Sequence, residues 1–130
     1  MSRYLLDTHV LLWWAAGDSR LSKRYRDLIG NGSNEIIMSV VSVWEACIKA
    51  AQGKLELPRE PLAFFQSLAE RGRFTVLPVH MSHAALVYSL PRVHADPFYR
   101  LLICQARSEK IPLVSDDAIF FKYDLPDLIA

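Results

Sequence analysis

The sequence contains only two cysteines, which excludes the disulfide framework that stabilises many small secreted proteins. Cys47 and Cys104 both lie in apolar stretches, as buried free thiols usually do. The chain begins directly with a strand-like segment and no secretory signal, so we expect a protein of the reducing cytoplasm. The longest apolar run, from Val10 to Ala16, is too short to span a bilayer, and no membrane association is expected.

The sequence also lacks an excess of charge of one sign, since its formal net charge is +1. Its bulk electrostatics therefore do not indicate a nucleic-acid-binding protein. Basic residues are nevertheless grouped between Arg20 and Arg26 and again between Arg92 and Lys110. The first group could bind RNA phosphates, although a solvated helix face is the more common outcome for such a group.

No internal repeat, low-complexity tract or linker interrupts the chain, and its 130 residues fit a single domain over residues 1–130. Short apolar runs alternate with helical periods, a pattern that favours an α/β fold with a parallel sheet. The predicted strands are residues 4–6, 36–38, 75–77, 113–115 and 128–129. The first predicted helix follows Asp7, passes through Trp13 and Trp14 and stops at Gly17. The other predicted helices run from residue 22 to 29, 39 or 42 to 53, 61 to 72, 82 to 90 and 96 to 110.

Several acidic residues fall where parallel sheets usually bind their ligands. Asp7 follows the first predicted strand, and the pair Asp116 and Asp117 follows the fourth. Ligands of open parallel sheets bind outside the carboxyl ends of the strands. Residues far apart in the sequence are therefore expected to meet at one edge of the sheet.

Glu45 is predicted to be buried, because it shares a helix face with apolar residues. That face carries Val41, Trp44, Ile48 and Ala51. A buried carboxylate needs a partner, which could be a basic side chain, a proton or a metal ion. Converging carboxylates repel one another, and a divalent cation removes this conflict. Oxygen ligands suit Mg²⁺ or Mn²⁺ rather than zinc, and such an ion can activate water for the hydrolysis of a phosphodiester.

Each acidic residue also has a purely structural interpretation. Asp7 could cap the helix that follows it, and Asp116 and Asp117 could form a turn and a helix cap. Glu45 could be a half-buried residue at the edge of an apolar stripe. The prediction of a site therefore depends on the whole set of acidic residues and on no single member.

Four segments carry a pattern that extends over nearly the whole chain. They are LLDTH at 5–9, SVWEACIK at 42–49 followed by GKL at 53–55, LP at 90–91 with HADPFYRLLI at 94–103, and LVSDD at 113–117 followed by Phe120. Together these segments resemble the PIN domain, and in particular the VapC-type toxins of bacterial toxin–antitoxin systems. The resemblance is specific because all four segments occur in order.

The resemblance implies a three-layer α/β/α sandwich with a central parallel sheet. It implies a Mg²⁺ or Mn²⁺ site, RNA as the substrate and frequent homodimers. It also implies a small antitoxin partner that blocks the site, commonly with a basic side chain placed among the carboxylates. The acidic ligands of the family carry over to Asp7, Glu45 and Asp117, and Ser115 matches a hydroxyl residue often found there.

One position departs from the family pattern. Related sequences usually read Asp-Pro-Phe-Asp-Arg, and the second Asp is the better match to a third metal ligand; here that position is Tyr99. Tyr99 shares a helix face with Ile103 and Ala106, so we expect it to point inward. A phenol with a pKa near ~10 is a poor ligand for a hard cation. Asp96, one turn earlier, could replace the missing acid, or could simply cap the helix that Pro97 opens.

Three functions are compatible with these residues to different degrees. The first is a metal-dependent endoribonuclease toxin, weakened by Tyr99. The second is a catalytically impaired binding module that keeps the fold and pairs with an antitoxin or RNA. A phosphatase with a strand-end Asp nucleophile is disfavoured, because Asp7 is followed by Thr8 and His9 rather than by a second Asp two residues on.

Overall fold

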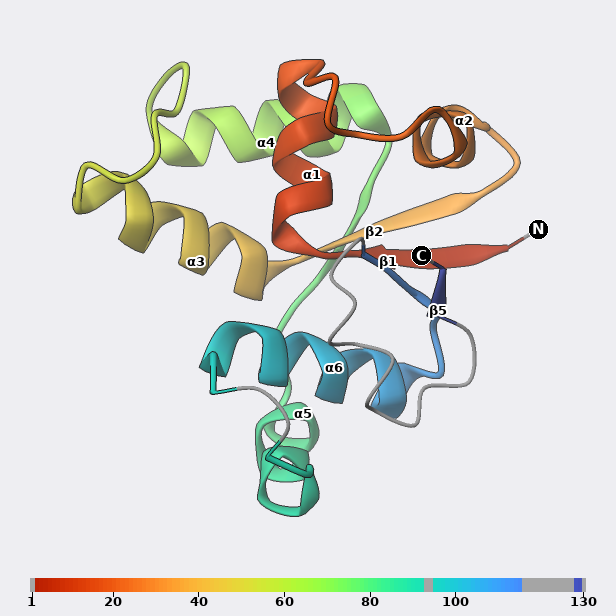
Figure 1. The fold of residues 1–130 in the computed structure, drawn as a ribbon, viewed down its shortest axis with the longest axis vertical. Coiled ribbons are helices and arrows are strands. Elements are labelled where there is room, and N and C mark those ends of the chain that lie inside the picture. Colours follow the sequence, from red (N-terminus) through yellow and green to blue (C-terminus); the bar gives the residue numbers. More distant parts are fainter. Residues whose placement is uncertain (1, 93–94, 116–127, 130) are drawn as a thin grey trace.

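The computed structural model of the chain describes residues 2–92, 95–115 and 128–129, and Figure 1 shows how their elements are arranged. The described residues form one parallel sheet with the strand order β3-β2-β1-β4-β5. The predicted strands are confirmed to within one residue at each end. The strands are β1 (Arg3–Leu6), β2 (Glu35–Ser39), β3 (Thr75–Leu77), β4 (Leu113–Val114) and β5 (Leu128–Ile129).

Helices connect the strands and begin at the residues that the sequence marks as caps. The side chains of Ser22, Ser39 and Asp96 each accept a hydrogen bond from a backbone N–H of the helix that follows. Ser39, rather than Ser42, therefore begins the central helix. The helices are α1 (Thr8–Ala16), α2 (Lys23–Gly30), α3 (Val40–Ala51), α4 (Pro61–Gly72), α5 (Met81–Leu86), the 3₁₀ helix η1 (Val87–Ser89) and α6 (Pro97–Glu109).

The helices cover both faces of the sheet, with α1, α2 and α4 on one side and α5 and α6 on the other (Figure 1). Adjacent strand residues point to opposite faces, so Leu5 packs in the core with α6 and Leu6 packs in the core with α1. The helix α3 contributes to both cores, through Val41 and Ala46 respectively. The predicted three-layer α/β/α sandwich with a central parallel sheet is confirmed.

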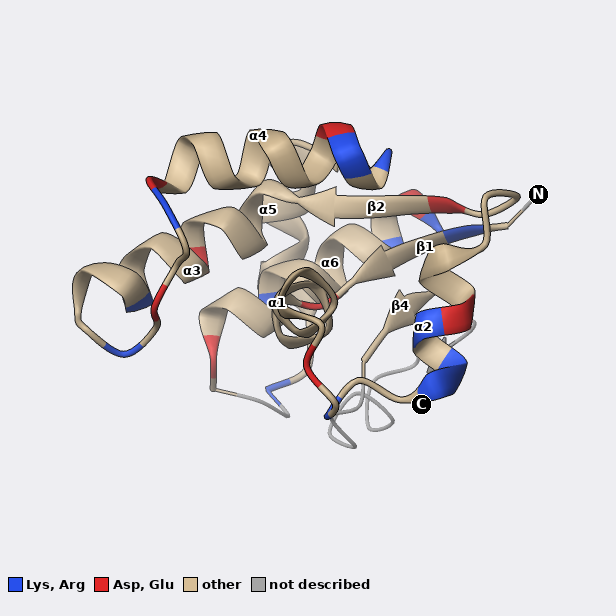
Figure 2. Cartoon of the chain, turned by 90° about the horizontal axis from the view of Figure 1, so that it is seen from above, with Lys and Arg blue, Asp and Glu red and all other residues tan. Residues whose placement is uncertain are grey.

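The first basic segment lies mainly on a solvated surface. Figure 2 shows basic and acidic residues together along α2, which buries only Tyr25 and Ile29. Lys23 forms an ion pair with Asp27 at 2.8 Å, and both side chains are largely exposed. Such exposed pairs contribute little to stability, so this helix face needs no functional explanation.

The two thiols are free among the described residues, as predicted. Cys104 is buried in the core, and burial raises the pKa of its thiol. Cys47 is only half-buried, so the prediction of two buried thiols is wrong for that residue.

Candidate active site

Asp7 lies at the carboxyl end of β1 and is completely buried. Its Oδ1 atom accepts a hydrogen bond from the backbone N–H of Val10 at 2.8 Å, so Asp7 is the N-cap of α1. The positive end of the helix dipole favours a carboxylate at this place. The predicted capping role is therefore confirmed, and the cap fixes one orientation of the Asp7 side chain at the edge of the sheet.

Glu45 is buried on α3, with 1% of its surface exposed, as the sequence predicts. Its Oε2 atom accepts a hydrogen bond from Nζ of Lys49 at 2.5 Å, one helical turn later. Its Oε1 atom is also buried, and it has no hydrogen-bond partner among the residues that the structure describes. A buried carboxylate oxygen without a donor is costly, by about 1–3 kcal/mol or more. The Oε2 atom of Glu45 is thus paired with Lys49, and its Oε1 atom is available to a further positively charged ligand.

The buried face of α3 differs from the face that the periodicity predicts. Ser42 is fully buried together with Glu45, whereas Trp44 is 55% exposed. Trp44 packs edge-on against Phe98 of α6, with ring centroids 5.1 Å apart. The predicted burial of Trp44 in an apolar stripe is therefore wrong, because the buried face of α3 is centred on Val41, Ser42, Glu45 and Ala46 instead.

A buried hydrogen bond brings the segments of the two acids together. The hydroxyl of Thr8 donates to the hydroxyl oxygen of Ser42 at 2.9 Å. Thr8 directly follows Asp7, and Ser42 lies about one turn before Glu45 on α3. Asp7 and Glu45 consequently reach the same edge of the sheet, where the first turns of α1 and α3 meet.

Tyr99, at the position where a further acid is expected from the sequence, points inward from α6. It is 6% exposed and packs in the same core as Ile103, so the predicted inward face is confirmed. Its hydroxyl forms a hydrogen bond with Nδ1 of His9 at 2.9 Å. Sequence reasoning missed this pair, which joins α6 to α1 two residues after Asp7.

Asp96 is half-buried and caps α6, since its Oδ1 atom accepts a hydrogen bond from the backbone N–H of Phe98 at 2.9 Å. The capping interpretation is therefore confirmed.

Asp116 and Asp117 lie outside the described residues. Within residues 2–92, 95–115 and 128–129, no three His, Cys, Asp or Glu side chains gather closely enough to hold a metal ion. The described part of the candidate site thus consists of two buried acids, one lysine and the pair of His9 with Tyr99.

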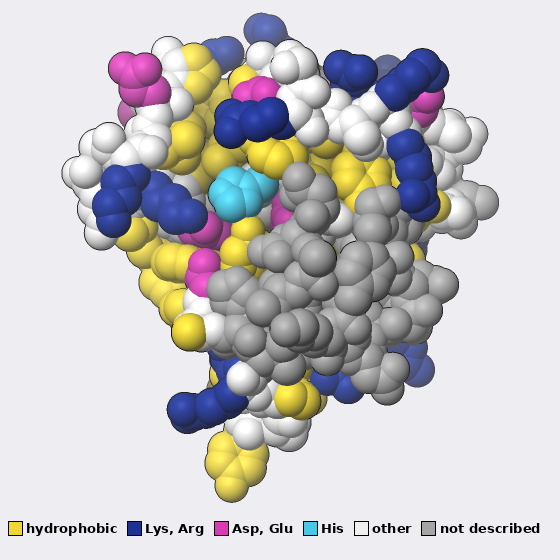
Figure 3. Space-filling model, in the orientation of Figure 1, with side chains coloured by type: hydrophobic (Ala, Val, Ile, Leu, Met, Phe, Trp, Pro, Cys, Tyr) yellow, Lys and Arg dark blue, Asp and Glu magenta, His cyan; other side chains and the backbone are white. Residues whose placement is uncertain are grey.

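The space-filling view shows acidic side chains beside one histidine on the same face, with basic side chains around them (Figure 3). Acidic and basic side chains are thus mixed on the part of this face that the structure describes.

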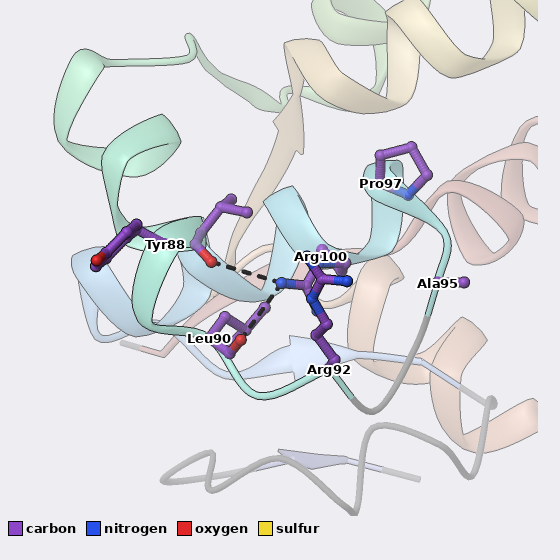
Figure 4. Close-up of a pocket in the computed structure, with 7 residues that line it drawn as sticks. Tyr88, Leu90, Arg92, Ala95, Pro97 and Arg100 are labelled. Atoms are coloured by element: carbon purple, nitrogen blue, oxygen red, sulfur yellow. Dashed lines mark hydrogen bonds between the residues drawn. The ribbon is translucent and has the colours of Figure 1, made fainter.

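Away from these residues, a hollow of about 800 Å³ lies between η1 and the start of α6 (Figure 4). Two arginines line it, Arg92 and Arg100. The guanidinium of Arg100 donates to the backbone carbonyls of Val87 and Leu90, at 3.5 Å and 3.3 Å, so it ties η1 to α6. None of the described residues that line this hollow is acidic, so they offer no carboxylate ligand for a metal ion.

The comparisons with known proteins place this fold and these residues in a family. A family model for the PIN domain matches residues 4–125, and the chain belongs to the PIN domain family. It is 32% identical over 118 residues to Ribonuclease VapC22 of Mycobacterium tuberculosis, an alignment that covers 90% of this chain and 88% of that protein.

Solved structures with the same fold are toxin–antitoxin complexes. A DNA-bound VapBC complex from Salmonella typhimurium matches with a TM-score of 0.69 at 17% identity, and covers 98% of this chain and 96% of that one. VapBC2 from Rickettsia felis, bound to a DNA fragment from its promoter, matches with a TM-score of 0.67 at 17% identity and the same coverage. At such identities the likeness shows the fold. No helix of the described residues has the length and apolar character needed to cross a membrane.

Proposed function

We propose that this protein is a metal-dependent endoribonuclease and the toxin of a toxin–antitoxin pair. Its membership of the PIN domain family and its likeness to a VapC ribonuclease support the nuclease activity. The observation that carries the metal dependence is the buried Oε1 atom of Glu45, which has no hydrogen-bond partner among the described residues and lies at the edge shared with Asp7. An oxygen in that situation suits a cation.

The donor set that we propose for the ion is Asp7, Glu45 and Asp117, with Asp96 as the candidate for a further carboxylate. Carboxylate oxygens are hard ligands and favour Mg²⁺ or Mn²⁺. When bound, such an ion supplies an activated water molecule and offsets negative charge on the phosphoryl group. Asp96 uses one oxygen for its helix cap, and a carboxylate has a second oxygen that can bind elsewhere.

The chain's own residues have separate tasks in this proposal. The helix cap orients Asp7, and Lys49 orients Glu45 by holding Oε2, which leaves Oε1 as the oxygen for the ion. The hydrogen-bonded pair of Tyr99 and His9 fills the place of one carboxylate and adds no acidic ligand. The site then attracts a divalent ion less strongly than a site with one more acid, so we infer a weakened nuclease.

We propose that the protein pairs with a small antitoxin, because the solved complexes with its fold are VapBC assemblies. A homodimer and a cytoplasmic location remain predictions of the same proposal. Co-expression of the chain with a small protein encoded beside it, followed by affinity purification of the pair, tests the partner. Recovery of the chain alone would contradict it.

Removal of the metal is expected to stop the reaction. The purified chain should cleave single-stranded RNA in Mn²⁺ or Mg²⁺, should lose this activity in EDTA, and should regain it when Mn²⁺ is added in excess. Gel analysis of end-labelled RNA measures the products. Cleavage that persists in EDTA would contradict the metal dependence. No cleavage under any condition, together with retained antitoxin binding, would favour the binding-module alternative.

Replacing Lys49 with Met is expected to tighten Mn²⁺ binding by about two- to tenfold. The metal-free Glu45 would lose its cationic partner, and the ion would no longer approach a positive charge. Isothermal titration calorimetry measures the affinity, and Lys54→Met is the control, since Lys54 has the same side chain outside this ion pair. Unchanged or weaker binding in Lys49→Met would show that the lysine does not compete with the ion.

A further inference from the structure

A groove of about 530 Å³ lies beside the candidate site, between α1 and the segment that joins α3 to α4. Leu12, Leu57 and Phe64 are among its apolar walls. His9 lines the groove as well, and its ring also forms a hydrogen bond with Tyr99. The groove therefore shares His9 with the candidate active site, and a molecule in the groove would lie against that residue.

Three side chains of the groove lie against one another, with Trp13 as the shared neighbour. The rings of Trp13 and His9 are nearly parallel, with an interplanar angle of 19° and centroids 6.0 Å apart. The guanidinium carbon of Arg20 lies 5.2 Å from the centroid of Trp13. Trp13 is therefore next to both the cation Arg20 and the ring of His9, which lies two residues after Asp7, the N-cap of α1.

The guanidinium of Arg20 is held in place by an ion pair but is not buried. The side chain of Arg20 is 69% exposed and forms an ion pair with Asp18 at 2.7 Å. Hydrogen bonds from Arg20 lower the pKa of Asp18 to about 2, so this carboxylate stays charged at neutral pH. Lys54 adds a second positive charge to the groove, and Glu56 adds one negative charge. Arg20 is thus a solvent-accessible positive charge at the groove, held beside Trp13 by Asp18.

We propose that this groove binds one nucleobase of the RNA next to the cleaved phosphate, stacked on Trp13, and this rests on the ribonuclease function proposed above. A base is a flat π system that stacks on aromatic rings, and its phosphate suits Arg20 and Lys54 at the same groove. An apolar protein segment could also pack on these walls and on the ring of Trp13, but it would bring no anion to Arg20 and Lys54. The stack on Trp13 is therefore a determinant of affinity for single-stranded RNA, and of preference for the base that stacks best.

The test uses a pool of random-sequence 20-mer RNA with Mn²⁺, and sequencing of the cleaved ends. Wild type and Trp13→Phe should prefer a base at one position beside the cut, because both retain an aromatic ring. Trp13→Leu should lose that preference, and its kcat/KM should fall at least about fivefold, mainly through KM. Trp44→Leu is the matched control, since Trp44 is an exposed tryptophan on α3 outside the groove, and it should behave as wild type.

A second measurement needs no variant of the groove. A set of RNAs that share one cleaved sequence is prepared, each with an abasic nucleotide at a different position. Cleavage should be slowest for the RNA that lacks the base which stacks on Trp13. Equal cleavage at every abasic position, or equal preference in Trp13→Phe and Trp13→Leu, would overturn the base subsite and leave the nuclease function standing. That outcome is expected if a protein segment is the natural occupant. Absence of cleavage by the wild type would instead overturn the nuclease function, and the subsite with it.

Discussion

Replacing Asp7 with Asn is expected to abolish RNA cleavage, with a loss of at least about a hundredfold in rate. Asn caps helices as well as Asp does, so the hydrogen bond to the N–H of Val10 should remain and α1 should stay intact. The substitution removes one negative charge from the proposed donor set without a change of shape. The growth arrest that a toxin causes on expression should disappear as well.

The control for this variant is a second Asp→Asn change on the surface. Asp27 lies exposed on α2 and pairs only with Lys23 among the contacts of the described residues, so Asp27→Asn should keep full activity. Thermal unfolding of both variants measures stability, which should remain close to that of the wild type. Cleavage by Asp7→Asn within a few-fold of the wild type would argue that Asp7 is only a helix cap.

The second large effect is a gain of function. Changing Tyr99 to Asp is expected to tighten Mn²⁺ binding by at least about tenfold and to raise the rate of RNA cleavage. The new carboxylate would take the place of the neutral hydroxyl beside His9 and would add charge to the proposed donor set. Calorimetric titration with Mn²⁺ and the end-labelled RNA assay measure the two quantities.

The same variant should be less stable without metal. Tyr99 is buried, and its replacement by a short charged side chain costs about 2–4 kcal/mol in unfolding free energy. Part of this loss should return when Mn²⁺ is added, which thermal unfolding can follow. Tyr99→Phe is the matched control: it removes the hydroxyl that bonds to His9, adds no charge, and should gain neither affinity nor activity. If Tyr99→Asp also gains neither Mn²⁺ affinity nor cleavage activity, the tyrosine at this position does not weaken the site.

Most of the fold can be predicted from the sequence, because its signals are local. The buried strands are short apolar runs, and their alternate residues, such as Leu5 and Leu6, pack on opposite faces of the sheet. The helix starts follow from Ser22 and Asp96, whose side chains cap within three residues of themselves. The burial of Glu45 also follows from a local period, that of its helix.

The partners within the candidate site could not be predicted in the same way. Helical spacing leaves open whether Glu45 pairs with a base, a proton or an ion, and Lys49 is only one of the basic residues nearby. The bond between Tyr99 and His9 joins residues 90 positions apart, so it depends on how α6 packs against α1. Neither side chain carries a local pattern that indicates the other.

The most direct test of the account is a crystal of the protein soaked in Mn²⁺, with the ion located by its anomalous scattering. The account predicts an ion at the carboxyl edge of the sheet, bound by Oε1 of Glu45 and by a carboxylate oxygen of Asp7, with metal–oxygen distances of about 2.0–2.4 Å. An ion bound elsewhere, or a Glu45 carboxylate that contacts only Lys49 at saturating Mn²⁺, would contradict it.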